Sequence, residues 1–322
     1  LSIATGSLTI INTGALNLGQ GTVGGDLSAT SNTGAITQTA ALTITGTSSI
    51  NAGGAAITLT EALNNFNGAV SLTNSGANTV AITDTDTLTF GTLSIAGNLT
   101  TIINAGVLFL GQGTVGGNLS ATSNNGIIRT TGALTITGTS SINAGANYIE
   151  LTNSSNDFVG AVTLNATGAT IAIRDANALT LASPTLGANT GIRAIAGTTL
   201  TLPSFSFSTG AGNIDFQSGS GTLATNGTLT TSSGTVSLKG SAGVTVGHNI
   251  TTTSGSVSVI GAGVNLTSTN TIDAGSSTIT LDGNDGAITL TGALTTTNIT
   301  SAAIVIQNAS TVSLGNITTG AT

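Results

Sequence analysis

The feature that most constrains this chain is an internal repeat, because residues 19–73 recur almost unchanged at residues 111–165. The offset is 92 residues throughout this block and becomes 91 near Ile171, so that Ala81 aligns with Ala172. A fixed period in a chain rich in Gly, Thr and Ser indicates a stacked architecture in which each unit contacts only its neighbours. The sequence therefore predicts a quasi-one-dimensional stack whose length is set by the number of its units.

Short runs of apolar, polar, apolar order recur along the whole chain. This period of two is typical of a strand with one buried face. Turn-forming Gly or Asn follows every three to six residues, which leaves no room for a helix of three turns. We therefore expect an all-β fold whose interior is lined by alternate residues, such as Leu42, Ile44, Ile57, Leu59, Leu134 and Ile136.

The length of one coil is visible in the second half of the chain. Residues 229–238 correspond to residues 250–259 at an offset of 21, and a looser copy follows from Ile272. One coil is thus about 21–22 residues long, and the 92-residue unit is expected to hold about four slightly longer coils. Coils of this size with short strands favour a single right-handed parallel β-helix, a β-solenoid of about 14–15 coils.

Stacking also explains the unusual composition, in which only 5% of residues are charged and 2% are aromatic. In a parallel β-helix each residue lies over its own counterpart, so equal charges would repel across the strand spacing. Threonine, Ser, Asn, Val and Ile stack without that cost. The low charge therefore needs no membrane to explain it.

The coil pattern divides the chain into two segments. Residues 1–184 carry the two copies of the long repeat, and residues 185–322 continue the β-helix with coils of the shorter length. Pro184 and the stretch 203–207 mark the change. Because proline fits a turn or bulge but not a central strand, we expect one perturbed coil within a continuous solenoid rather than a flexible linker.

Several partner classes are disfavoured by the distribution of residue types. The four basic residues are isolated from one another, whereas binding to nucleic acid requires clustered Lys and Arg. No apolar run approaches the ~18 residues that a membrane helix needs, so the chain is not expected to be membrane-embedded. The chain has no cysteine, so disulfides do not hold the fold.

An enzyme must be considered, because polysaccharide lyases and hydrolases also use parallel β-helices. Such chemistry requires grouped carboxylates, and the closest acids in sequence are the pairs Asp84/Asp86 and Asp282/Asp285. Asp and Asn exchange between the copies, as turn-capping side chains do, since both bond the backbone two residues on. We therefore predict no catalytic residues. The exchanges are Asp86 with Asn177, Asp26 with Asn118, and Asp157 with Asn65.

Three further motifs are candidates for ligand sites. His248 is the one histidine, and it has no cysteine or second imidazole with which to share a metal. Asp282 and Asp285, in a Gly/Asp-rich turn, form a candidate calcium site, although calcium rolls need that turn in tandem. Residues 19–24 contain G-x-G-x-x-G but precede β-patterned sequence, whereas a dinucleotide site needs a helix there. No metal other than this candidate calcium and no cofactor are expected.

Four phrases carry a resemblance to a known class of proteins: residues 113–120 (GTVGGNLS), 132–139 (GALTITGT), 156–164 (NDFVGAVTL) and 175–181 (DANALTL). Together they resemble the β-strand repeats of filamentous-haemagglutinin-like bacterial exoproteins and adhesins, exported by two-partner secretion or as autotransporter passengers. The resemblance covers about residues 1–181 and rests on coil style beyond them. It implies a right-handed parallel β-helix at the surface of a Gram-negative cell, with no catalytic residues.

The sequence thus favours a non-catalytic extracellular β-solenoid, a structural stalk or an adhesin segment. Its expected partners are further copies of itself, a host or neighbouring cell surface, or glycans. Neither residues 1–3 nor residues 318–320 look like the polar cap of a terminal coil. Either the chain is part of a longer polypeptide, or identical subunits stack end to end into a filament. The first alternative is favoured, and a polysaccharide-acting enzyme is the remaining alternative.

Overall fold

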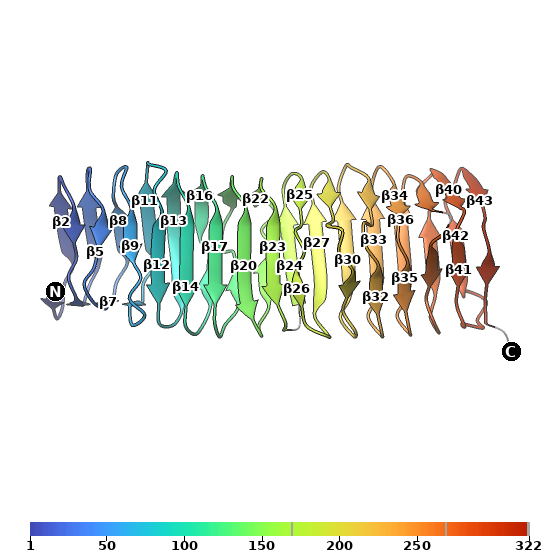
Figure 1. Cartoon of the computed structure of the whole chain (residues 1–322), viewed down its shortest axis with the longest axis horizontal. Coiled ribbons are helices and arrows are strands. Elements are labelled where there is room, and N and C mark those ends of the chain that lie inside the picture. Colours follow the sequence, from blue (N-terminus) through green and yellow to red (C-terminus); the bar gives the residue numbers. More distant parts are fainter. Residues whose placement is uncertain (169, 268, 321–322) are drawn as a thin grey trace. The chain divides into compact units, whose positions relative to one another are not determined.

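The computed structural model describes residues 1–168, 170–267 and 269–320, in two compact units, Leu1–Asn165 and Ala166–Thr322. In each unit the chain winds as a parallel β-solenoid, and strands of consecutive turns lie side by side (Figure 1). The described residues form no helix, and hence none that could cross a membrane. The two units comprise about 15 turns, which confirms the predicted all-β parallel solenoid. The right-handed sense of the coil stays a prediction.

The strands of the first unit lie on three faces, which the chain visits in the order 1, 2, 3. Face 1 consists of β1 (Ser2–Ile3), β4 (Gly21–Val23), β7 (Leu42–Ile44) and β10 (Asn65–Phe66), then the start of β13 (Leu88–Ile95), β15 (Leu108–Phe109), β18 (Ile128–Arg129) and β21 (Ile149–Leu151). Face 2 consists of β2 (Leu8–Asn12), β5 (Leu27–Ser31), β8 (Ser48–Asn51), β11 (Val70–Asn74), the rest of β13, β16 (Gln112–Val115), β19 (Leu134–Ile136) and β22 (Asp157–Phe158). Face 3 consists of β3 (Leu16–Asn17), β6 (Ile36–Thr37), β9 (Ile57–Leu59), β12 (Val80–Asp84), β14 (Leu99–Ile103), β17 (Leu119–Ser123) and β20 (Ser140–Gly145).

The strands of the second unit likewise lie on three faces. One sheet consists of β24 (Thr170–Asp175), β27 (Gly191–Ala196), β30 (Ile214–Ser218), β33 (Val236–Gly240), β36 (Val257–Gly261), β39 (Ile279–Asp282) and β42 (Ile304–Gln307). Another consists of β31 (Leu223–Ala224), β34 (Val244–Val246), β37 (Val264–Leu266), β40 (Ala287–Leu290) and β43 (Thr311–Ser313). The third consists of β29 (Phe207–Ser208), β32 (Leu229–Thr231), β35 (Ile250–Thr252), β38 (Thr271–Asp273), β41 (Ala293–Thr295) and β44 (Ile317–Thr318). The remaining strands are β23 (Val162–Ala166), β25 (Leu179–Thr180), β26 (Thr185–Leu186) and β28 (Leu200–Thr201).

Parallel pairing sets the register, because each residue lies beside its equivalent one turn on. In the second unit Ile214 pairs with Val236, Val236 with Val257, and Val257 with Ile279. The residue number thus advances by 22, then 21, then 22 along these turns, which confirms the predicted coil length. The segment boundary predicted at 184 is not tested by these pairings and stays a prediction.

The long repeat holds about four coils, as expected, but the expectation that these coils are slightly longer is wrong. On face 2, Thr30 pairs with Asn51, Asn51 with Thr73, Thr73 with Ser94, and Ser94 with Thr114. Four turns therefore reach only from position 30 to position 114, which is eight positions short of the repeat. The remaining eight residues of the repeat lead from face 1, at position 22, to face 2, at position 30.

The two copies consequently lie on successive faces. Thr22 belongs to face 1, whereas its copy, Thr114, belongs to face 2. In the same way Thr37 on face 3 corresponds to Arg129 on face 1. The repeat thus spans four turns and about one third of another. The fold tolerates this shift by one face because inward and outward side chains alternate in the same way on every face.

The interior of each unit is mainly aliphatic, as alternation predicts. All six residues named from the sequence as interior have fully buried side chains. In the second unit Phe207 and Phe216 are also buried, and their rings meet edge to face with centroids 5.1 Å apart. Pro203 lies outside the strands, between β28 and β29, as expected for a residue without an N–H to donate.

One set of interior positions is polar, which the alternation did not predict. A row of buried threonines follows the inner edge of the β29–β44 sheet, and each hydroxyl donates to a carbonyl at the next corner. Thr209 donates to Gly212 at 2.6 Å, and Thr231 and Thr252 donate to Gly234 and Gly255 in the same manner. The hydroxyl group thus replaces a backbone donor where the chain turns, which satisfies a buried carbonyl.

We predict that inward and outward neighbours on one strand differ sharply in their effect on stability. Replacing the fully buried Ile44 with Ala should lower the free energy of unfolding by about 2–4 kcal/mol, because it leaves a cavity in a close-packed interior. The control is Thr43→Ala on the outer side of the same strand, which should change it by less than about 0.5 kcal/mol. Urea unfolding measures both. Equal effects of the two substitutions would contradict the assigned orientation of β7.

Candidate functional site

The acids that could have formed a catalytic pair are held at a corner of the first unit. Asp84, at the end of β12, is fully buried, and its carboxylate accepts hydrogen bonds from the backbone N–H of Phe66 at 2.8 Å and of Asp86 at 2.9 Å. Asp86 instead meets the side-chain amide of Asn65, with Nδ2 3.5 Å from Oδ2. Asp84 therefore ties the corner to the preceding turn and supports the turn-capping interpretation.

Burial raises the pKa of Asp84 to about 6, from its usual 3.8, against the lowering effect of its two backbone hydrogen bonds. The nearby carboxylate of Asp86 raises the pKa further. A carboxyl group with this pKa holds its proton more firmly in the folded chain than in the unfolded chain.

The exchange of Asp26 for Asn118 between the copies conserves one hydrogen-bonding role. Asp26 Oδ1 accepts from the N–H of Thr47 at 2.7 Å and from its hydroxyl at 3.0 Å. Asn118 Oδ1 accepts from the equivalent groups of Thr139 at 2.8 and 3.1 Å. The bond reaches the next turn rather than the backbone two residues on, so this detail of the expectation is corrected. An oxygen is all that the position requires, and either side chain supplies it.

The candidate calcium residues lie in a turn of the second unit. Asp282 Oδ1 accepts from the N–H of Asn284, while Oδ2 accepts from the side-chain amides of Gln307 and Asn308, all at 2.9 Å. The hydrogen bond from Gln307, first, and that from Asn284 lower the pKa of Asp282. Asp285 adopts a φ of 67°, in the left-handed region. A calcium ion at Asp282 would have to displace these donors, and the calcium site itself stays a prediction.

The other two motifs have structural surroundings of their own. His248 is exposed, and its Nδ1 lies 3.2 Å from the carbonyl oxygen of Thr225. The glycine run 19–24 enters strand β4, and no helix follows among its described neighbours. Gly21 has a φ of 119°, and a Cβ there would lie 1.9 Å from the carbonyl oxygen of Leu1 on the adjoining turn. These glycines serve close approach between turns. Within the described residues no three His, Cys, Asp or Glu side chains gather as a metal site.

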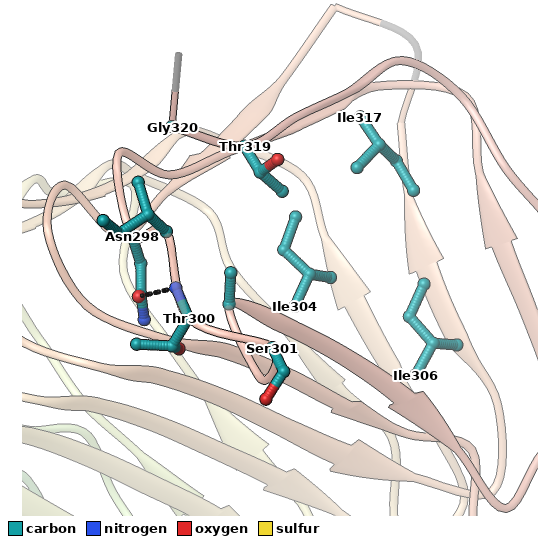
Figure 2. Close-up of a pocket in the computed structure, with 10 residues that line it drawn as sticks. Asn298, Thr300, Ser301, Ile304, Ile306, Ile317, Thr319 and Gly320 are labelled. Atoms are coloured by element: carbon teal, nitrogen blue, oxygen red, sulfur yellow. Dashed lines mark hydrogen bonds between the residues drawn. The ribbon is translucent and has the colours of Figure 1, made fainter. Parts of the chain in front are cut away.

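A cavity of about 560 Å³ lies at the last described turn of the second unit (Figure 2). Isoleucine side chains and Thr319 line it, and Asn298 Oδ1 accepts from the N–H of Thr300 at 2.9 Å beside it. Its apolar residues stand one turn beyond buried ones: Ile304 beyond Ile279, Ile306 beyond Leu281, and Ile317 beyond Leu294. The cavity therefore lies in line with the apolar interior.

Sequence reasoning missed a buried asparagine that each copy carries at an equivalent corner. Asn64 Oδ1 accepts from the N–H of Leu42 at 2.9 Å, and its Nδ2 donates to the carbonyl of Leu59 at 3.1 Å. Asn156 makes the same two bonds, to Leu134 and Leu151, each at 3.2 Å. Its identity in both copies, amid Asp/Asn exchange elsewhere, is the signal that could have revealed it. Both the oxygen and the NH₂ of the side-chain amide are needed, and Asp cannot replace Asn here because its carboxylate has no N–H to donate.

The copies differ in how fully this corner is satisfied. Gln38 exchanges two hydrogen bonds with Asn64, at 2.7 and 2.9 Å. The residue equivalent to Gln38 in the second copy is Thr130, whose buried hydroxyl has no hydrogen-bond partner among the described residues. The second copy therefore lacks the amide pair that closes this corner in the first.

We predict that the pH dependence of stability depends on Asp84. Because its pKa is raised in the folded chain, its contribution is fully present below pH ~4 and is lost as pH rises through about 6. Asp84→Asn should therefore flatten the fall in the free energy of unfolding between pH 4 and pH 6, by on the order of 1–3 kcal/mol. Urea titrations of both proteins across this range measure the change. The control for the loss of a carboxylate is Asp26→Asn, at an exposed corner where the other copy carries Asn118. A steeper fall in Asp84→Asn than in the parent would contradict the assignment.

We also predict that Thr130→Gln stabilises the second copy. The new amide should pair with Asn156 as Gln38 pairs with Asn64, and raise the free energy of unfolding by about 1 kcal/mol. The reciprocal change, Gln38→Thr, should lower it by a similar amount. Thermal and urea unfolding compare the two variants. A loss of stability in Thr130→Gln would show that the corners of the two copies are not equivalent.

Residues 5–73 and 100–165 match a family model described as repeats of unknown function (DUF5649). The two matched segments contain the two copies and lie within the first unit. No curated protein and no solved structure matches the chain. The chain is therefore a β-solenoid repeat protein, and its two matched segments are similar to these repeats of unknown function.

Proposed function

We propose that this chain is a non-catalytic structural and adhesive β-solenoid, a stalk or adhesin segment at a bacterial cell surface. The observation that carries the proposal is that polar side chains hydrogen-bond one turn to another. Asp26, Asp84, Asn118 and Asp282 each accept hydrogen bonds from the backbone or side chains of another turn. These groups join turns to one another, and the fold extends by adding turns.

The proposed location rests on the resemblance to filamentous-haemagglutinin-like exoproteins, carried by residues 113–120, 132–139, 156–164 and 175–181. The composition agrees with it, because a chain without Cys or Met exposes no readily oxidised sulfur outside the cell. The partners proposed are a host or neighbouring cell surface and its glycans.

The test compares adhesion with turnover in the same purified protein. Beads coated with the chain should adhere to bacterial or host cells more than albumin-coated beads do. Incubation of the chain with a panel of polysaccharides should release no new reducing ends. Adhesion at the level of albumin would overturn the adhesive role. Polysaccharide cleavage that Asp84→Asn or Asp86→Asn abolishes would establish an enzyme instead.

A second candidate function is a filament subunit that stacks end to end. The repeating register favours it, since Val236 pairs with Val257 and Val257 with Ile279 in the same parallel manner from turn to turn. A strand edge that is not covered can add a further strand, so one copy can continue the stack of another. Intact mass with electron microscopy decides. A chain of 30.9 kDa that forms fibres supports stacking, whereas a heavier polypeptide without fibres refutes it.

A further inference from the structure

The two copies provide an internal comparison of what the fold requires and what it leaves free. None of the positions that differ between residues 14–73 and residues 106–165 is buried in either copy. The interior has therefore been kept and the surface has changed. Where one copy carries surface residues of types that are rare in this chain, packing of the interior does not explain them.

Six of the differing positions lie together on three consecutive turns of face 1, and we name them the 107–150 patch. Phe109 pairs with Arg129, and Arg129 with Glu150, on strands β15, β18 and β21. Val107, Ile127 and Tyr148 come two residues before these three and so point to the same side. In the first copy the equivalent residues are Ala15, Asn17, Ala35, Thr37, Ala56 and Thr58.

The side chains of the patch are already ordered against one another. The guanidinium carbon of Arg129 lies 5.9 Å from the ring centroid of Phe109, within the range of a cation–π contact. Arg129 Nη2 lies 3.0 Å from Glu150 Oε2. The Arg129 and Glu150 side chains are 34% and 44% exposed, and Tyr148 is 39% exposed. The patch thus presents rings, a donor and an acceptor to solvent.

Stability does not account for these residues. The first copy builds the same strands with Asn17, Thr37 and Thr58. An exposed ion pair such as Arg129–Glu150 contributes only about 0.2–1 kcal/mol. The patch also contains the one tyrosine of the chain and one of its four basic residues, which are rare residue types in this composition. The residues are therefore suited to contact with a ligand.

We propose that the 107–150 patch binds an uncharged oligosaccharide that lies along the three turns. This deepens the adhesive function proposed above and rests on it. The rings of Phe109 and Tyr148 offer apolar faces to the C–H faces of sugar rings. Arg129 and Glu150 offer a charged donor and a charged acceptor to hydroxyl groups, which form strong hydrogen bonds with such partners.

The geometry favours this class over the alternatives. Strand β18 is paired on both sides, to β15 and β21, so a peptide cannot add to it as another strand. Arg129 and Glu150 neutralise each other, so the patch has no net field to attract a polyanion. The surface of six residues is far smaller than the ~800 Å² that each partner of a stable dimer buries. This argues against a second copy of the chain as the ligand.

The chain itself supplies the matched variants for a test. A removal variant carries the residues of the first copy at all six positions: V107A, F109N, I127A, R129T, Y148A and E150T. A transfer variant places the patch on the first copy instead: A15V, N17F, A35I, T37R, A56Y and T58E. Thermal unfolding of both variants verifies that the solenoid is intact before binding is measured.

The probes are cellohexaose, chitohexaose and maltohexaose, titrated by calorimetry, and an array of neutral glycans. The parent chain should bind at least one neutral glycan at a single site. The removal variant should lose roughly 30-fold or more in affinity, because the aromatic and Arg side chains dominate the contact. The transfer variant should bind the same glycan at two sites.

Two results overturn the proposal: no neutral glycan binds the parent, or the removal variant binds as well as the parent. Coated beads then separate this proposal from the adhesive function. If the removal variant adheres like the parent, the patch is not the adhesive site although the adhesive function stands. If the parent binds the glycan but its beads do not adhere, the patch stands and the adhesive function fails.

Discussion

The structure depends on one constraint, which is that every strand pairs in parallel with its own equivalent one turn on. Like residues therefore lie over like residues at about 4.8 Å. Outside, this favours small uncharged side chains, as in the series Thr30, Asn51, Thr73, Ser94 and Thr114. Inside, it favours aliphatic columns. At the corners, where backbone groups lose their regular partners, side-chain oxygens take over, as Asp84 and Asn64 do.

The same constraint separates the period of the sequence from the period of the fold. The repeat is not a whole number of turns, so a copied segment returns one face further round, as Thr22 and Thr114 do. Thr37 and Arg129 are equivalent in sequence but lie on faces 3 and 1. A surface feature acquired by one copy thus points in a different direction from its counterpart. This freedom gives a duplicated solenoid different surfaces on an unchanged interior.

Much of the fold could be predicted from alternation, since Leu42 and Ile44 flank Thr43 and the side chains segregate accordingly. The row of buried hydroxyl groups at Thr209, Thr231 and Thr252 could not be predicted in this way. A polar residue is expected to be exposed unless the carbonyl group that accepts its hydrogen bond is known. The rotation of the copies was hidden for another reason: corners vary by a residue or two, so turn length is not fixed by one offset. The 107–150 patch could be recognised only from the pairing of β15, β18 and β21 together with the differences between the two copies.

The central claim, that the repeat spans four turns and about a third of another, is tested most directly by distances between spin labels. The chain has no cysteine, so introduced pairs are unambiguous. Labels at positions 30 and 114 are four turns apart on one face, and their backbone separation should be about 19 Å. Labels at positions 22 and 114 lie on different faces and should be further apart. A 22–114 distance equal to or shorter than the 30–114 distance would contradict the account.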